Sequence, residues 1–249
     1  MKKSKFENKL SASGPSYQPL YKQVEEYVKQ LIVEQRWKPG EILPNEFQLA
    51  DELNVSQGTV RKALNTLTSE NILVRKQGVG TFVSEHTGQH ALYRFFPIVG
   101  DGLPPELPMS ETIQRKVILA QGDVAKNLEL KESEEVIVLS RRRRIHNEMC
   151  ILEDIYLPIK YFKNLMGEVE IPHTLYHFYQ TNYHHTVQDI SDQIKAILAN
   201  EEDAKQLEIS VNDPLLMFTR IAKTLNGKLI EYRITRCRTD KYHYLVNHI

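Results

Sequence analysis

The chain has 249 residues, enough for two domains of ordinary size. Its 32 basic and 32 acidic residues balance, which excludes a protein that binds nucleic acid through bulk positive charge but not one with a local nucleic-acid surface. A hydrophobic content of 41% excludes a disordered chain.

Neither a membrane span nor a secretion signal is expected. No apolar run approaches the roughly 18 residues of a membrane-spanning helix. The first residues, MKKSKFENKLSASG, are basic but lack the apolar core of a signal peptide, so we expect a frayed tail. We therefore expect a cytoplasmic protein in which Cys150 and Cys237 are free thiols.

The first third of the sequence predicts three helices followed by a hairpin. Apolar residues recur at helical spacing from Pro19 to about Gln35. Asn45 is the expected N-cap of a second helix, and Ser56 that of a third. The third helix is expected to end near Asn71, and two strand-like runs at 72–76 and 81–83 flank the glycine-containing tip of a β-hairpin.

The same region resembles the DNA-binding domain of the GntR family of bacterial transcription regulators. The strings that carry the resemblance are PLY, PGEILP, LADELNVSQGTVRKAL and QGVGTFV, all between residues 19 and 84. The resemblance implies a winged helix-turn-helix, in which the third helix is the recognition helix and enters the major groove of double-stranded DNA.

The predicted DNA contacts lie at the start of the third helix and at the hairpin tip. Side chains and backbone N–H groups face DNA at such a helix start, and Gly58 lets the backbone approach closely. Arg61 lies one turn further on, on the solvent side. The predicted contacts are Glu46, Phe47, Ser56, Gln57, Gly58, Thr59, Arg61, Lys76, Gln77 and Gly78.

Two of these residues depart from the family pattern. Phe47 and Gln57 both stand where the family often has arginine. Arginine reads O6 and N7 of guanine, whereas glutamine reads N6 and N7 of adenine. We therefore expect an operator that differs from the common one of the family.

The rest of the chain predicts an α+β domain. Residues 85–110 are rich in glycine and proline and are expected to form a linker and an irregular entry segment. Tight polar turns between strand-like runs predict antiparallel pairing, and residues 187–198 fit either a helix or a strand. Strands are expected at 112–120, 136–146, 149–157, 214–225 and 228–238, and helices at 123–130, 174–180 and 201–207.

This half resembles the effector-binding UTRA domain of the HutC subfamily of GntR regulators, which has a chorismate-lyase-like antiparallel sheet with helices. The landmarks are Arg141-x-Arg143 followed by Glu153, then Thr174-Leu175-Tyr176, and Glu231-Tyr232. The resemblance implies that the effector pocket is lined by Arg141, Arg143, Glu153, Thr174, Tyr176 and Glu231, and Arg233 is a further candidate on the same strand face as Glu231.

The arginine pair predicts an anionic effector. Arg141 and Arg143 point to the same face of their strand because side chains alternate, while Arg142 and Arg144 point to the other. Two guanidinium groups on one wall can bind a phosphate or a carboxylate bidentately. Glu153 on the next strand would orient a ligand hydroxyl or amine, or else close an internal salt bridge with one of the arginines.

The class of anion stays open. Phosphosugar-binding members usually carry Ser or Thr beside a Phe at the domain entrance, which here reads LYRFFP over residues 92–97. Cys237 also replaces a residue that is commonly aromatic. A phosphosugar, an organic acid and an amino-acid derivative are therefore all candidates.

Two other groupings are weaker. His173 and His177 are four residues apart and His184-His185 follows, but no cysteine or carboxylate completes a zinc pattern. Asp189 and Asp192 are better interpreted as part of a solvated face than as an acid–base pair. We expect neither a metal nor a cofactor.

Together these features predict a homodimeric repressor that binds a palindromic operator and responds to a small anion. The expected domains are a winged helix-turn-helix at 15–85, a linker at 86–95 and an effector-binding and dimerisation domain at 96–249. Two alternatives are an enzyme that acts on a small acid and a DNA-binding protein without an effector.

Overall fold

The computed structural model describes residues 18–87, 94–167 and 169–246. The chain forms two compact units, Met1–Glu85 and His86–Ile249. The expected frayed tail and the first two residues of the 92–97 entrance lie outside the described residues. None of the described helices is long and apolar enough to cross a membrane.

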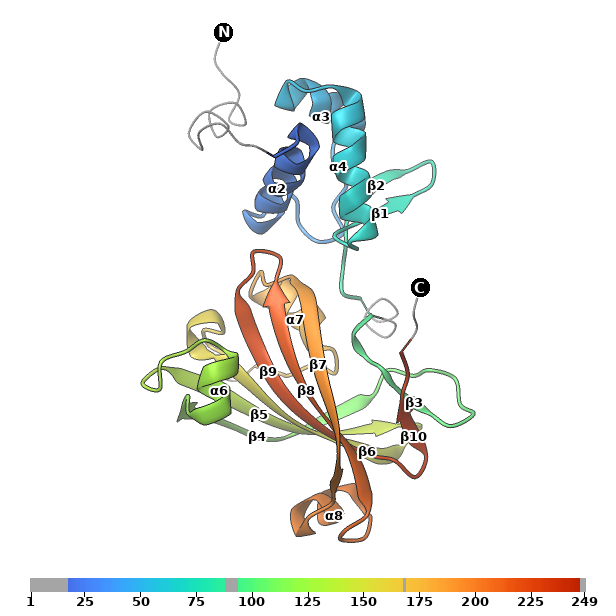
Figure 1. Cartoon of the computed structure of the whole chain (residues 1–249), viewed down its shortest axis with the longest axis vertical. Helices are drawn as coiled ribbons and strands as arrows, with labels where there is room; N and C mark the ends of the chain where they lie inside the picture. Colours follow the sequence, from blue (N-terminus) through green and yellow to red (C-terminus); the bar gives the residue numbers. More distant parts are fainter. Residues whose placement is uncertain (1–17, 88–93, 168, 247–249) are drawn as a thin grey trace. The chain divides into compact units, whose positions relative to one another are not determined.

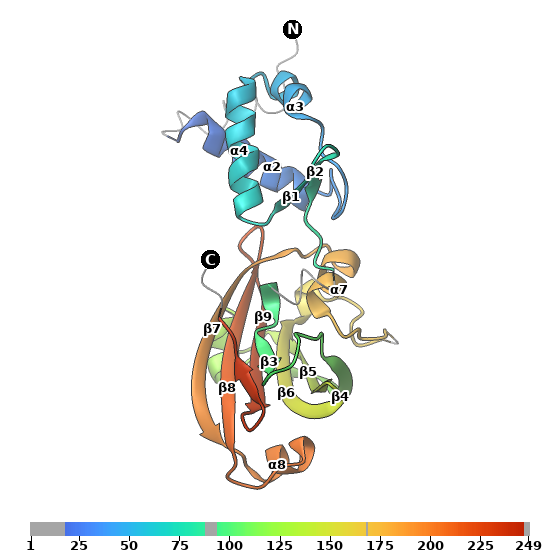
Figure 2. The ribbon, with the colours of Figure 1, turned by 90° about the vertical axis from the view of Figure 1, so that its right-hand side faces the viewer.

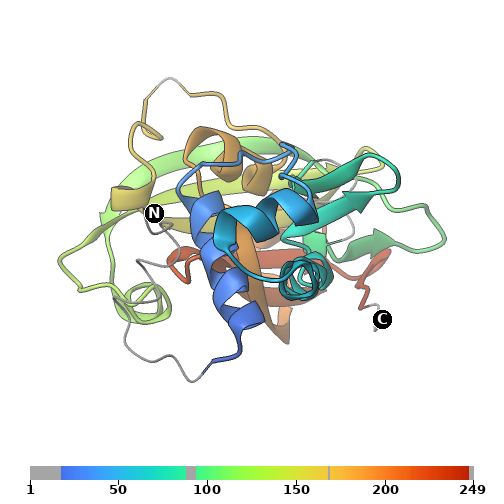
Figure 3. The same ribbon diagram turned by 90° about the horizontal axis from the view of Figure 1, so that it is seen from above.

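Three helices form the body of the first unit (Figures 1 and 3): α2 (Leu20–Val33), α3 (Glu46–Leu53) and α4 (Gln57–Ser69). Both predicted caps are present. The Asn45 side chain accepts a hydrogen bond from the backbone N–H of Gln48, whose side chain accepts one from the Asn45 backbone in return. Ser56 accepts from the backbone N–H of Thr59 and so fixes where α4 begins.

A β-hairpin of β1 (Leu73–Lys76) and β2 (Gly80–Val83) follows α4, as predicted. The turn between the strands requires a positive φ at Gly78, which has a φ of 72°, and glycine adopts this conformation without strain. The core under the hairpin joins all three helices through side chains that are almost fully buried: Val24, Val28, Leu49, Val60, Leu64, Leu67, Leu73 and Val83.

The second unit is built on a six-stranded antiparallel sheet with the strand order β4-β5-β6-β9-β8-β7 (Figure 1). The strands are β4 (Met109–Leu119), β5 (Glu135–Ile145), β6 (Glu148–Pro158), β7 (Val187–Leu198), β8 (Pro214–Thr224) and β9 (Leu229–Arg238). Residues 187–198, which fit either a helix or a strand in sequence, form β7 and pair with β8 along their whole length.

The described parts of the segment 85–110, residues 85–87 and 94–110, are more ordered than the composition predicts. They contain β3 (Ile98–Gly100), which pairs with β10 (Tyr242–Tyr244) in a separate small sheet. His86 and Phe95, at the ends of the expected linker, are both buried in the second unit, and the His86 backbone N–H donates to Gln180. Apolar contacts and hydrogen bonds thus order residues that a glycine- and proline-rich composition assigns to a linker.

Helices cover the two faces of the large sheet (Figures 1 and 2). On one face, α7 (Leu175–Asn182) packs with the 3-10 turn η1 (Ile159–Tyr161) over the odd-numbered residues of β5 and β6, such as Leu139 and Ile155. On the other face, α6 (Gly122–Asn127) and α8 (Glu201–Leu207) pack over residues such as Val136 of β5 and Leu152 of β6. Arg141, Arg143 and Glu153 are odd-numbered, so their side chains lie on the α7 face.

Candidate nucleic-acid interface and small-molecule pocket

In the first unit, Glu46 connects three elements. Its carboxylate accepts a hydrogen bond of 2.8 Å from Nε of Arg61 in α4 and one of 3.2 Å from Arg75 in β1. The side-chain amide of Gln57 lies 3.4 Å from the same carboxylate. The predicted contacts at Glu46, Gln57 and Arg61 are therefore neighbours in space, and Arg75 joins them although the sequence prediction did not include it.

The remaining predicted contacts surround this cluster. Ser56 and Gly58 are exposed at the start of α4, and Lys76, Gln77 and Gly78 are exposed along the hairpin tip. Thr59 is half-buried, and its hydroxyl bonds to that of Ser56. Phe47, beside Glu46, is 70% exposed and so is available for an apolar contact with a partner.

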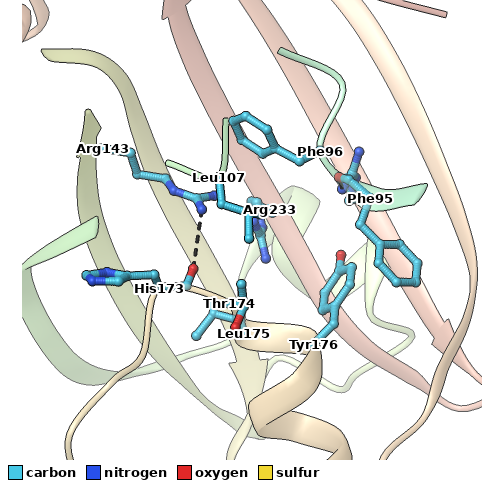
Figure 4. Close-up of a pocket in the computed structure, with 10 residues that line it drawn as sticks. Phe95, Phe96, Leu107, Arg143, His173, Thr174, Leu175, Tyr176 and Arg233 are labelled. Carbon is cyan, nitrogen blue, oxygen red and sulfur yellow. Dashed lines mark hydrogen bonds between the residues drawn. The ribbon is translucent and has the colours of Figure 1, made fainter. Parts of the chain in front are cut away.

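In the second unit, one pocket opens beside the N-terminus of α7 (Figure 4). Arg143 of β5 and Arg233 of β9 line one side of it, and Arg220 of β8 also belongs to the lining. Residues 173–176 form the opposite side, and the Tyr176 hydroxyl points toward the arginines. Phe95, Phe96 and Leu107 complete the lining. The cavity volume is about 40 Å³, which holds a few waters or one small acidic group.

The seven predicted effector residues divide into two groups. Four of them line the pocket: Arg143, Thr174, Tyr176 and Arg233. The other three, Arg141, Glu153 and Glu231, are buried behind that lining. Arg220 lines the pocket but was missed, because a single arginine in an apolar strand gives no signal in the sequence.

Glu153 forms the internal salt bridge that was the alternative to a ligand contact. Its Oε1 accepts from Arg143 at 3.1 Å and from Arg233 at 2.9 Å, and its Oε2 lies 3.8 Å from Nε of Arg141. Burial raises the pKa of the Glu153 carboxyl, but the three guanidinium groups outweigh burial and hold the pKa well below its usual range. Glu153 is therefore an anion in the folded protein.

Glu231 holds Arg233 and α7 in place. Arg233 donates to both carboxylate oxygens of Glu231, each at 2.9 Å. The hydroxyls of Tyr176 and Tyr179, both on α7, donate to the same two oxygens at 2.9 and 2.8 Å. Burial raises the pKa of both tyrosines, so they stay protonated and donate. The network thereby ties the pocket wall on β9 to the start of α7.

Asp192 holds Arg220 in place, as Glu231 holds Arg233. Its two oxygens accept from Nε and Nη2 of Arg220 at 2.7 and 2.6 Å, and the Tyr244 hydroxyl donates to it at 2.6 Å. Asp189 is exposed. The two aspartates therefore do not form an acid–base pair, and Asp192 is half-buried in an ion pair instead of lying on a solvated face.

The histidines do not gather into a metal site within the described residues, where no group of three potential metal-binding side chains occurs. His173 instead accepts a hydrogen bond at Nδ1 from the backbone N–H of Ser110, and His185 bonds to the carbonyl of Tyr161. Both cysteines are free and buried.

Two family models match the chain. The model described as UTRA domain matches residues 107–243, and the one described as Bacterial regulatory proteins, gntR family matches residues 20–83. The chain belongs to the GntR family and carries a UTRA domain. It is therefore a transcription regulator that combines a helix-turn-helix with an effector-binding domain.

Similar proteins of nearly the same length support this assignment. The Escherichia coli (strain K12) mannosyl-D-glycerate transport/metabolism system repressor MngR is 27% identical over 92% of this chain and 95% of its own. The HTH-type transcriptional regulator GgaR of the same organism is 26% identical over 91% of this chain and 90% of its own. Since these relatives are regulators, the enzyme alternative loses its support.

Solved structures show the same fold at lower identity. YydK from Bacillus subtilis subsp. subtilis str. 168 aligns with a TM-score of 0.56 at 20% identity, covering 93% of this chain and 100% of its own. PhnF from Mycobacterium smegmatis aligns with a TM-score of 0.54 at 18% identity, covering 90% of this chain and 99% of its own.

Proposed function

We propose that this GntR regulator is a homodimeric repressor in the bacterial cytoplasm and that a small anion in the α7 pocket controls its affinity for a palindromic operator. The observation that carries the effector class is the set of three arginines, Arg143, Arg220 and Arg233, that line one small cavity. Buried guanidinium groups lose hydration, so a ligand that supplies negative charge and hydrogen-bond acceptors is favoured there.

The direction of control follows from linkage. An effector that binds one arrangement of the dimer more tightly shifts the population toward that arrangement, and operator affinity falls if the spacing of the recognition helices then misfits the half-sites. The relatives MngR and the probable fructoselysine utilization operon repressor of Escherichia coli are described as repressors, which favours repression here.

Two features support a dimer: the two halves of a palindromic operator and the exposed apolar residues on an edge strand of the sheet. Each chain supplies one helix-turn-helix, so two chains match the two halves of a palindrome. The edge strand β4 also leaves Met109, Ile113, Val117 and Leu119 exposed, which supports an apolar contact between copies. Light scattering coupled to size-exclusion chromatography should give twice the chain mass, and a monomeric mass at working concentration would contradict this part of the proposal.

The test of the effector site compares Arg143→Gln with Arg142→Gln. Arg143 lines the pocket, whereas Arg142 points to the other face, where it pairs with the exposed Glu111. A metabolite panel screened by thermal shift identifies ligands, and fluorescence anisotropy on DNA selected from a random pool measures operator affinity. We expect Arg143→Gln to lose the ligand response and keep operator binding, and Arg142→Gln to keep both.

Other outcomes of this comparison would contradict the proposal. Ligand response that survives Arg143→Gln would place the effector elsewhere. Operator affinity that no ligand changes would favour the alternative of a DNA-binding protein without an effector.

A further inference from the structure

Seven charged groups meet on the α7 face of the sheet, and their charges do not cancel. The carboxylates form ion pairs with the arginines at 2.6–3.8 Å. Asp203, another buried acid among the described residues of this unit, belongs to a separate pair with Arg236 next to α8. The cluster consists of Arg141, Arg143, Arg220 and Arg233 against Glu153, Glu231 and Asp192, so one positive charge is in excess.

The excess charge lies beside the pocket. Arg143 is buried, and its Nε has no hydrogen-bond partner within the described part of the chain. Burial and the neighbouring Arg143 lower the pKa of Arg141 to about 9, and burial also lowers the pKa of Arg143. Burial therefore disfavours the charged forms of Arg141 and Arg143, and one added negative charge beside them would offset that cost.

The pocket offers many donors and few free acceptors. Each oxygen of Glu231 already accepts from one tyrosine and from Arg233. Oε1 of Glu153 accepts from two arginines. Its Oε2 has no hydrogen-bond partner among the described residues, but Glu153 does not line the cavity. A sugar-like ligand needs acceptors for its hydroxyl protons, and these carboxylates are not available to it.

The rest of the lining is partly apolar. The Phe96 ring lies 4.9 Å from the Arg143 guanidinium carbon, and Leu107 borders the same side of the cavity (Figure 4). A ligand group next to these side chains would lose hydration without gaining hydrogen bonds, which favours an apolar group there.

We infer that the effector is a monoanionic carboxylate with a compact apolar body, not a doubly charged phosphate ester with several hydroxyls. One negative charge neutralises the excess of the cluster, whereas two would leave a buried negative charge in its place. Both Nη groups of Arg143 already donate, to Glu153 and to the backbone carbonyls of Pro108 and His173. Its unpartnered Nε would donate to one oxygen of the carboxylate. This inference rests on the proposed function, because it takes the α7 pocket as the effector site.

Four small probes differ in whether they are charged, in how many negative charges they carry and in whether they have hydroxyl groups. They are isobutyrate, its neutral amide isobutyramide, isopropyl phosphate and glycerate. Each is titrated into the full chain by calorimetry at about pH 7.5, where a phosphate monoester is mostly a dianion because its second pKa is about 6. We expect isobutyrate to bind at least about tenfold more tightly than each of the other three, with Arg143→Gln removing its binding.

A change of cluster charge gives the second test. Glu153→Gln raises the excess to two positive charges, so the preference should shift toward isopropyl phosphate by about tenfold relative to the wild type. Glu111→Gln, which removes a carboxylate from the exposed pair with Arg142, is the matched control and should keep the wild-type preference. The wild-type series alone still tests the inference if Glu153→Gln does not fold.

The outcomes separate the inference from the proposed function. If isopropyl phosphate or glycerate binds as tightly as isobutyrate, and Arg143→Gln abolishes that binding, then the anion site stands and the inference is overturned. If isobutyramide binds as tightly as isobutyrate, or if isobutyrate binding survives Arg143→Gln, then the anionic effector site itself is wrong.

Discussion

At the scale of single residues, Glu46 connects the side chains that we propose contact DNA. It bonds to Arg61 and Arg75 and lies within reach of Gln57, so it joins α3, α4 and the hairpin. These pairs are exposed and contribute little to stability. These ion pairs instead hold the guanidinium groups in position. A guanidinium group bound to one carboxylate still has free N–H groups to donate to a base or a phosphate.

Arg61→Ala should weaken operator binding by about 1–3 kcal/mol, because Arg61 is exposed one turn into the recognition helix. Anisotropy titrations at one fixed salt concentration measure the effect. Arg144→Ala, an exposed arginine of β5 in the second unit, is the control and should change nothing. An unchanged dissociation constant for Arg61→Ala would remove this residue from the interface.

Gln57→Arg should move the preference at one symmetric operator position from adenine toward guanine. The new guanidinium would start near Glu46, which lies 3.4 Å from the present amide and can orient it. Selection from randomised DNA, run in parallel for both proteins, reveals the preferred bases. Identical selected motifs would show that residue 57 does not read a base.

At the scale of elements, local signals set the boundaries of the first unit. α3 begins at its capping box and ends at Asn54, which has a left-handed conformation with a φ of 52°. Asn71 after α4 has a φ of 57°, as expected for a helix C-terminus. Side-chain caps therefore determine where these helices start, and asparagines in the left-handed conformation mark where they stop.

Asn45→Ala should lower the free energy of unfolding by about 0.5–2 kcal/mol, because the first turn of α3 loses its cap. Urea titration of Trp37 fluorescence measures this, since Trp37 is the single tryptophan and is buried in the first unit. Asn45→Asp should keep the cap and the stability. A loss as large for Asn45→Asp as for Asn45→Ala would contradict a capping role.

Long-range contacts explain what the sequence did not predict. The apolar side chains of residues 187–198 fit the spacing of a helix as well as that of a strand, and pairing with β8 selects the strand. The residues before β3 look like a linker because glycine and proline surround them, yet Phe95 reaches the core beside Tyr176. Arg141, Arg143 and Glu153 were placed on one face by alternation, but which of them lines the cavity depends on the packing of α7 and Arg233.

At the scale of the whole molecule, the two units rely on different stabilising interactions. The first unit has an apolar core, and its ion pairs Arg36–Glu52 and Arg61–Glu46 are largely exposed. The second unit buries a charged cluster next to an apolar core, and removing one charge there leaves its partners unpaired in a low dielectric. Changes of pH should therefore affect the units unequally.

Acidification should unfold the second unit before the first. The ion pairs hold the pKa values of Glu153 and Asp192 below their usual ranges, although burial alone would raise both. Unfolded Glu and Asp titrate near pH 4.3 and 3.9, so the stabilisation is fully present above about pH 5 and is lost progressively as the pH falls below these values. Tyrosine circular dichroism reports mainly on the second unit, which holds nine of the twelve tyrosines, including the buried Tyr176 and Tyr179. Trp37 fluorescence follows the first unit.

Glu153→Gln is the variant that assigns this acid sensitivity to the cluster. An uncharged side chain at position 153 does not titrate, so the variant should start less stable at neutral pH and lose less stability between about pH 5 and pH 3. Glu111→Gln, on the exposed face of the sheet, should follow the wild-type profile. Two outcomes would show that the cluster does not govern the acid stability of the second unit. One is that the tyrosine and Trp37 signals change at the same pH in a single transition. The other is that the pH profile of Glu153→Gln runs parallel to that of the wild type.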